Sequence, residues 1–233
     1  MHIVLTRPLE DCFDLMRKLN VIGHTVTHIP ALKIYPLKID KINFSRFKAL
    51  VFTSSNAIRN FKFHDEAKFL KCYCVGSQTA KTAKEYGLLN ITFADGSVNA
   101  LKQLILNDLE PKLNPLLYLR GEFVSGELDT DLAREGFSVQ SVINYTTQPT
   151  KEIGESNLKF LKKNKPDAIL VYSLKSAENL LNLINKYSLL NVVTQSNLMC
   201  ISEKVLLVLK QIKWKKVFIF NPGEEEFLLS KIR

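Results

Sequence analysis

The stretch Lys48-Ala-Leu-Val-Phe-Thr-Ser-Ser-Asn-Ala-Ile-Arg-Asn-Phe61 decides the fold, because it recurs as Asp167-Ala-Ile-Leu-Val-Tyr-Ser-Leu-Lys-Ser-Ala-Glu-Asn-Leu180. Each copy is a short apolar run, then a hydroxyl residue, then an amphipathic run. Short, continuously apolar runs are typical of buried parallel strands, and the residues beyond Ser54 and Ser173 have helical spacing. A strand that turns at a serine directly into a helix presents a hydroxyl and free backbone N–H groups, which bind anions well.

Length and composition indicate a globular α/β protein. The 233 residues are enough for one large domain or two small ones, and the hydrophobic content of 46% is ample for a core. No stretch approaches the roughly 20 apolar residues of a membrane span. The start, Met1-His-Ile-Val-Leu-Thr-Arg-Pro8, lacks the basic residues and long apolar core of a signal peptide. We therefore expect a cytoplasmic protein without a membrane partner.

The formal net charge of +9 indicates a polyanionic partner. Charge alone does not choose among nucleic acid, a membrane surface and an acidic metabolite. No aromatic RNA-binding motif, zinc finger or basic helix is present in the sequence. We therefore expect a small-molecule polyanion rather than nucleic acid, bound by a monomer.

The four cysteines do not have the spacing of a disulfide framework or a zinc site. Cys72 and Cys74 form a C-x-C within an expected strand, so their side chains point to one face. A pair of buried thiols is the favoured interpretation, over a metal site or a redox pair. No metal ligands are assigned.

Strands and helices alternate along the whole chain. Strands or extended segments are expected at 2–7, 24–35, 49–52, 71–76, 91–94, 116–121, 137–147, 168–171, 198–201 and 217–220, with helices between most of them. Leu116-Leu-Tyr-Leu-Arg-Gly121 resembles the N-terminal strand, so the chain has the order A-B-A′-B′. Such alternation predicts two doubly wound parallel sheets. The repetition leaves open whether A packs with B or with B′.

Ligands of doubly wound sheets bind at the carboxyl ends of the strands. The residues expected there, and predicted to bind the substrate, are Arg7, Thr53, Ser54, Gly76, Ser77, Arg120, Gly121, Ser173 and Ser202. For Ser54 the alternative is a simple helix cap, since a cap uses the same backbone amides. For Arg7 the alternative is a surface ion pair. Both alternatives remain open from the sequence.

Five motifs in order give the chain a resemblance to a known family. They are Val4-Leu-Thr-Arg-Pro8, Val51-Phe-Thr-Ser-Ser-Asn-Ala57, Val75-Gly-Ser-Gln-Thr-Ala80, Leu117-Tyr-Leu-Arg-Gly121 and Tyr145-Thr146. Together they resemble uroporphyrinogen-III synthase over nearly the whole chain. The resemblance implies two flavodoxin-like domains, residues 1–35 with 149–233 and residues 44–141. The linkers, 36–43 and 142–148, would belong to a two-stranded antiparallel connection over a cleft.

The resemblance also implies an activity. The family cyclises hydroxymethylbilane, a linear tetrapyrrole with carboxylates on every ring, to uroporphyrinogen III with its last ring inverted. No metal or organic cofactor is implied. The position most often given a chemical role falls on Tyr145, whose phenol can donate a proton to the departing hydroxyl. The alternative is that Tyr145 only packs between domains.

Two features of the sequence depart from the family pattern. Ile201-Ser-Glu-Lys-Val205 stands where relatives carry glycine and hydroxyl residues, and no basic residue follows Gly121 closely. Weaker substrate binding or slower turnover than in typical members is therefore expected. A rival interpretation is a two-lobed binding or sensor protein that closes on an acidic ligand without catalysis.

Overall fold

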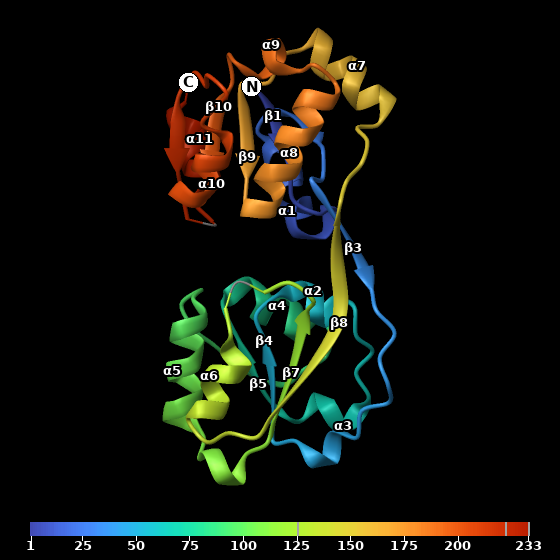
Figure 1. Ribbon diagram of the computed structural model, residues 1–233, viewed down its shortest axis with the longest axis vertical. Helices are drawn as coiled ribbons and strands as arrows, with labels where there is room; N and C mark the ends of the chain where they lie inside the picture. Colours follow the sequence, from blue (N-terminus) through green and yellow to red (C-terminus); the bar gives the residue numbers. More distant parts are fainter. Residues whose placement is uncertain (125, 222, 233) are drawn as a thin grey trace. The chain divides into compact units, whose positions relative to one another are not determined.

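The computed structural model describes residues 1–124, 126–221 and 223–232, which form two compact units. Unit 1 comprises Met1–Lys33 and Gln148–Arg233, and unit 2 comprises Ile34–Thr147. Each unit is an α/β structure with helices on both faces of one sheet (Figure 1). Within the described residues, no helix is both long enough and apolar enough to cross a membrane.

Unit 1 contains a five-stranded sheet in the order β11-β10-β9-β1-β2, in which all neighbours are parallel. The strands are β1 (His2–Leu5), β2 (Thr25–His28), β9 (Ala168–Val171), β10 (Asn197–Cys200) and β11 (Val217–Ile219). The N-terminal strand is hydrogen-bonded to β9 as well as to β2. The beginning of the chain therefore packs with its last part.

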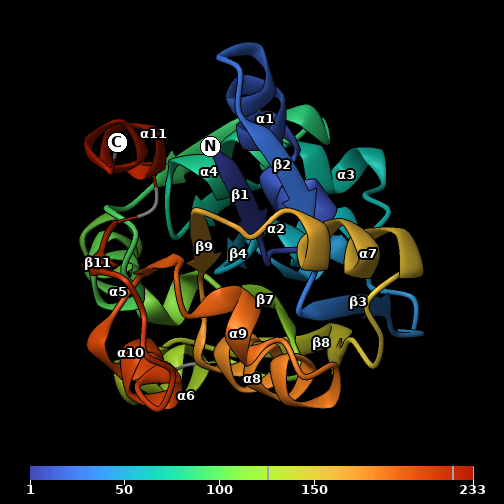
Figure 2. The same cartoon turned by 90° about the horizontal axis from the view of Figure 1, so that it is seen from above.

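The helices of unit 1 are α1 (Leu9–Val21), α7 (Glu155–Lys163), α8 (Leu174–Lys186), α9 (Leu190–Val193), α10 (Glu203–Leu209) and α11 (Glu225–Lys231). Successive residues of β1 point to opposite faces: Ile3 and Leu5 pack with α1 and α11, and Val4 packs with the α8 and α10 side. Figure 2 shows α8 and α10 together on one side of the sheet. Both faces are covered, so the strand is apolar from Ile3 to Leu5.

Unit 2 contains a six-stranded sheet in the order β3-β8-β7-β4-β5-β6. The strands are β3 (Leu32–Pro36), β4 (Ala49–Phe52), β5 (Lys71–Cys74), β6 (Asn90–Phe93), β7 (Leu116–Gly121) and β8 (Val139–Pro149). From β8 to β6 the neighbours are parallel. β3 and β8 are also the segments through which the chain passes between the two units.

The helices of unit 2 are α2 (Ser55–Arg59), α3 (Asp65–Lys68), α4 (Ser77–Glu85), α5 (Val98–Asp108) and α6 (Leu128–Arg134), with 3₁₀ turns η1 (Phe44–Arg46) and η2 (Pro111–Leu113). One face of the sheet packs against α2, α3 and α4, around Leu50, Phe52 and Leu119. The other packs against α5 and α6, around Val51 and Tyr118. This is the doubly wound arrangement expected from the alternating elements.

The predicted fold class is confirmed, and the differences are local. Helix α2 ends at Arg59, although the stretch with helical spacing runs on to Phe61. The rings of Phe61 and Phe63 pack against each other, and they contact Phe44 and Phe52, respectively. The single-turn elements α3, α9 and η1 were not predicted, since one turn is too short to show a helical period.

The four cysteines are buried free thiols. The Sγ atoms of Cys72 and Cys74 lie 3.7 Å apart on one face of β5. The hydrogen bond with Cys74, followed by burial, raises the pKa of Cys72, so the Cys72 thiol stays protonated. The prediction of a buried thiol pair is therefore confirmed.

Candidate functional site

The strand order of each sheet reverses at one point, and ligands of open α/β sheets bind beside that point. In unit 1 the reversal lies between β1 and β9, and in unit 2 between β4 and β7. Arg7 and Ser173 follow the two strands of the first reversal. Ser54 follows β4, and Arg120 lies at the end of β7, beside the second. Sequence-predicted residues thus gather at the carboxyl edge of each sheet.

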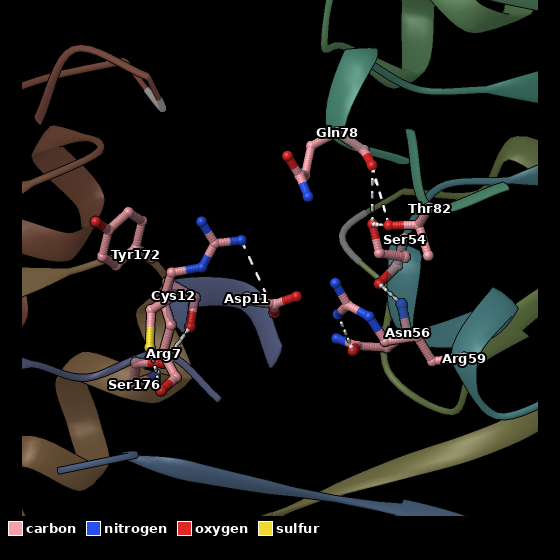
Figure 3. Close-up of polar contacts among 12 residues, drawn as sticks. Arg7, Asp11, Cys12, Ser54, Asn56, Arg59, Gln78, Thr82, Tyr172 and Ser176 are labelled. Carbon is pink, nitrogen blue, oxygen red and sulfur yellow. Dashed lines mark hydrogen bonds and ion pairs between the residues drawn. The ribbon is translucent and has the colours of Figure 1, made fainter. Parts of the chain in front are cut away.

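Arg7 is held by its surroundings in unit 1 (Figure 3). Its guanidinium lies 3.8 Å from the Asp11 carboxylate and 4.7 Å from the centre of the Tyr172 ring. The backbone carbonyl of Arg7 lies 2.8 Å from Nε2 of His28, within hydrogen-bond distance. The side chain of Arg7 remains 29% exposed. A cation in this position can bind an anionic ligand while its stem stays fixed.

Tyr172 carries the cation–π contact and is itself oriented by a buried carboxylate. Its hydroxyl donates to Glu225, at 3.1 Å, and its ring packs edge to face on Phe220. Burial, followed by the charge of Glu225, raises the pKa of Tyr172. Sequence reasoning did not assign Tyr172, although its place directly before Ser173 matches that of Thr53 before Ser54 in the repeat.

Arg120 has a comparable environment in unit 2. Its Nε lies 3.7 Å from Asp129, and Nη1 donates to the carbonyl of Gly121, at 3.1 Å. Burial opposes ionisation of Asp129, but the hydrogen bond from Ser141 and the nearby Arg120 hold the pKa of that carboxyl below its usual value. The side chain of Arg120 is 18% exposed, so most of it is shielded from solvent.

Tyr145 lies on β8, beside the end of β7, and is 8% exposed. Its ring belongs to the core on the α2 side of the sheet. The ring rests directly on Gly121, where a Cβ atom would lie 2.6 Å from Cζ of Tyr145. Gly121 is therefore needed to make room for the phenol, a role that sequence reasoning had not given it.

Thr53 also points toward a phenol in unit 2. Its Oγ1 lies 2.8 Å from the hydroxyl of Tyr118, which is almost fully buried. Burial raises the pKa of Tyr118, so this phenol stays neutral. The Thr53 hydroxyl is thus engaged with Tyr118 inside the unit.

Ser54, Ser173 and Ser202 are the N-caps of α2, α8 and α10. Their hydroxyls accept hydrogen bonds from the backbone N–H of Asn56, Ser176 and Val205, respectively, at 3.2, 3.1 and 3.4 Å. Figure 3 shows the Ser54 cap. The capping role is therefore present at all three serines. A hydroxyl that accepts from a backbone amide can still donate its own proton, and Ser173 already donates its proton to the Ser176 hydroxyl, at 2.8 Å.

Gly76 and Ser77 differ from those serines. Gly76 is the N-cap of α4 and has no side chain, so it does not cap the first amides of this helix as the serines do. The buried Thr82 hydroxyl, one turn into the helix, holds its first turn in place. It lies 3.1 Å from both the Ser55 hydroxyl and the Gln78 carbonyl. The contact with Ser55 ties α4 to α2.

Arg59 is a further cation that sequence reasoning did not assign. Its Nη1 donates to Oδ1 of Asn56 at 3.1 Å, which brings the guanidinium back toward the start of α2 (Figure 3). The helical spacing of three residues was the available signal. Across the described ranges, no three His, Cys, Asp or Glu side chains are grouped so as to hold a metal ion.

Comparisons with known proteins give one consistent result. The family model described as "Uroporphyrinogen-III synthase HemD" matches residues 14–223. The structure of uroporphyrinogen-III synthetase from Helicobacter pylori is 19% identical, covers 99% of each chain and has a TM-score of 0.63. A mutant uroporphyrinogen III synthase from Thermus thermophilus is 14% identical, with coverage of 99% of this chain and 97% of that one and a TM-score of 0.53. No match was found among the curated proteins.

Proposed function

The chain belongs to the uroporphyrinogen-III synthase family, and from that premise we propose how its residues carry out the reaction. The enzyme is a cyclising lyase that converts hydroxymethylbilane into uroporphyrinogen III and water in haem biosynthesis. The family match over residues 14–223 is the observation that carries this conclusion. A binding or sensor protein without catalysis is not favoured.

The carboxylates of the tetrapyrrole bind, in this proposal, at the carboxyl edges of the two sheets. Arg7 and Arg120 supply the cations, and both are part-exposed with their stems held in place. Ser54, Ser173 and Ser202 supply hydroxyls that are already oriented as helix caps. Preoriented donors lose little freedom when an anion binds.

The start of α4 is the strongest candidate for direct binding by backbone amides. Gly76 leaves these N–H groups without a side-chain cap, and Ser77 is exposed beside them. An incoming carboxylate can accept from these amides where the helix dipole favours negative charge.

Tyr145 is the proton donor of the proposed mechanism. Its phenol protonates the terminal hydroxyl of hydroxymethylbilane, which departs as water and leaves an azafulvene cation. The substituted carbon of ring D attacks this cation to form a spiro intermediate, which fragments and recloses with ring D inverted. The proton lost from ring D at closure returns to the phenolate, so the net change is the loss of one water molecule.

The test is an assay with freshly generated hydroxymethylbilane, followed by oxidation and chromatographic separation of the porphyrin isomers. Isomer III as the main product is expected, and isomer I alone, as in the enzyme-free control, would contradict the assignment. Tyr145→Phe keeps the ring but removes the acid, so turnover is expected to fall about a hundredfold. Tyr86→Phe, at an exposed ring beyond α4, is the matched control.

A monomer working in the cytoplasm is also proposed. Support for the compartment comes from the four buried cysteines, which are all free thiols, as is usual in a reducing environment. Sedimentation equilibrium across a range of concentrations tests the monomer, and cell fractionation tests the compartment.

A further inference from the structure

Strand β8 contains a bulge at Asn144. Arg120 of β7 pairs with Ile143 and Gly121 pairs with Tyr145, so Asn144 has no partner residue on β7. A bulge inserts one extra residue into a strand and redirects the side chains beyond it. Such features are frequent beside active sites.

The bulge changes the face on which Tyr145 lies. Along a regular strand, side chains alternate between the two faces. Val139 packs on the α5 and α6 side, and Val142 packs on the α2 side. Regular alternation from Val142 would place Tyr145 with Val139, but its ring packs in the α2-side core. The extra residue therefore brings the phenol to the α2 side.

The side chain of Asn144 holds the bulge in place. It is fully buried, and its Nδ2 donates to the carbonyl of Ala57 at 2.7 Å and, more weakly, to that of Asn60 at 3.4 Å. These carbonyls lie at the end of α2, a helix too short to satisfy its own last turn. The backbone carbonyl of Asn144 accepts from Leu37 at 2.9 Å.

We propose that Asn144 is a positioning residue for the reaction: its amide locks the β8 bulge onto α2 and so fixes the Tyr145 phenol on the α2 side. This inference rests on the proposed role of Tyr145 as the proton donor. The same amide links Tyr145 to the helix that Ser54 caps, so the acid and a proposed carboxylate-binding hydroxyl keep a constant separation. A phenol displaced by about 1 Å would lose up to about a hundredfold in rate.

Asn144→Leu tests this inference, because leucine has a similar volume and no donor. Asn197→Leu is a matched control in unit 1. Asn197 is also buried, its Nδ2 donates to one backbone carbonyl, that of Asp167, at 2.9 Å, and its Oδ1, like that of Asn144, has no hydrogen-bond partner among the described residues. Both variants are labelled with 3-fluorotyrosine, and the ¹⁹F resonance of Tyr145 is assigned from its loss in Tyr145→Phe.

Both substitutions are expected to lower stability, but only Asn144→Leu should move the Tyr145 resonance. It should also lower kcat and raise the share of isomer I, since the uncatalysed closure then competes. A Tyr145 resonance and a kcat that match those of Asn197→Leu would overturn the inference. Parent-like turnover of Tyr145→Phe would refute the proton-donor role instead, while the resonance would still decide whether Asn144 positions the ring.

Asn144→Asp keeps the test decisive if the leucine variant does not fold. A neutral carboxyl at this place can donate its proton to the Ala57 carbonyl, whereas the ionised form repels that oxygen. The Tyr145 resonance should therefore move toward the parent position as pH falls. A Tyr145 resonance that does not respond to pH in this variant would contradict the proposal that the side chain at position 144 positions the phenol through its bond to Ala57.

Discussion

At the scale of single residues, Gly121 is packed against the Tyr145 ring with no room for a side chain. A Cβ atom at Gly121 would lie 2.6 Å from Cζ, 2.8 Å from the hydroxyl oxygen and 2.9 Å from Cε2 of the phenol. Real side-chain contacts are not this short, so the ring would have to move. The ring is almost fully buried and has little free space.

Gly121→Ala is therefore expected to displace Tyr145, to lower stability by about 1–3 kcal/mol through overpacking and to reduce synthase turnover. Urea unfolding and the isomer assay measure the two effects. Gly154→Ala is the control, because a Cβ at that glycine meets nothing within 4 Å. Equal stability and turnover in the two variants would show that the contact with Tyr145 is unimportant.

The cations at the carboxyl edges show a second residue-scale feature. The guanidinium of Arg7 lies 3.8 Å from the Asp11 carboxylate, and that of Arg120 lies 3.7 Å from the Asp129 carboxylate. Both are ion pairs, but these distances are too long for a hydrogen bond. A second contact also orients each guanidinium: the Tyr172 ring for Arg7, and the Gly121 carbonyl for Arg120. The surface ion pair that the sequence left open for Arg7 is thus present, and it leaves the guanidinium part-exposed.

At the scale of elements, helix starts carry most of the candidate binding groups. Ser54 caps α2 and Ser97 caps α5 through similar bonds, 3.2 Å to the backbone nitrogen of Asn56 and 3.1 Å to that of Ala100. The two caps should contribute alike to stability, but only Ser54 lies among the proposed binding residues. Comparing them separates a capping role from a binding role.

Ser54→Ala and Ser97→Ala are each expected to cost about 1 kcal/mol of stability. Only Ser54→Ala should also raise KM for hydroxymethylbilane. Thermal unfolding and initial-rate kinetics provide the two measurements. A KM that rises equally in both variants, or in neither, would mean that Ser54 is a helix cap and nothing more.

Asp108 connects the end of α5 to β5. Its carboxylate accepts from the Tyr73 hydroxyl at 2.5 Å and from Lys71 at 3.2 Å. The hydrogen bond from Tyr73, followed by that from Lys71, holds the pKa of Asp108 below its usual value of 3.8. A pKa that is lower in the folded state means that stability is present above the unfolded pKa and is lost as pH falls through the folded one.

Tyr73→Phe is expected to weaken this pH dependence, since it removes the largest cause of the shift. The free energy of unfolding should then fall less steeply below about pH 4 than in the parent. Denaturant titrations at several acidic pH values measure the slope, and Tyr86→Phe serves as the control at an exposed tyrosine. If the free energy of unfolding depends on pH equally in the parent and in Tyr73→Phe, the hydrogen bond from Tyr73 does not contribute to the acid sensitivity.

At the scale of the whole molecule, the two units differ in how the chain builds them. Unit 2 is one continuous segment, Ile34–Thr147, with cores on both faces of its sheet. Unit 1 is discontinuous, and its strand β1, which lies between β9 and β2, comes from the N-terminus. Without residues 1–33, the β9 edge would have no strand beside it on that side.

A fragment of residues 34–147 is therefore expected to unfold cooperatively by itself. A fragment of residues 148–233 should gain protection of its β9 amides from hydrogen exchange only when residues 1–33 are added. Circular dichroism and hydrogen exchange are the measurements. Cooperative folding of 148–233 alone would contradict a dependence on β1.

The fold and much of the candidate site could be predicted from local patterns. Apolar runs marked strands such as 49–52 and 168–171, and glycines or serines marked the turns into helices. Residues placed at strand ends were predicted for the same reason, because a strand end is a local feature. Asn144 and Tyr172 were missed, because their importance comes from contacts with Ala57 and Arg7, which lie far away in sequence.

The sequence by itself determined the α/β class, the repeated order of elements and the family. Each depends on periodicity and motifs among neighbouring residues. The repetition left open how the halves pack, because they carry similar apolar patterns and either pairing would bury them. The resemblance implied that residues 1–35 pack with 149–233, but only the tertiary structure decided that β1 pairs with β9 and β4 with β7. It also decided the face of Tyr145, because a bulge is a mismatch in register between two strands and leaves no periodic signal in either one.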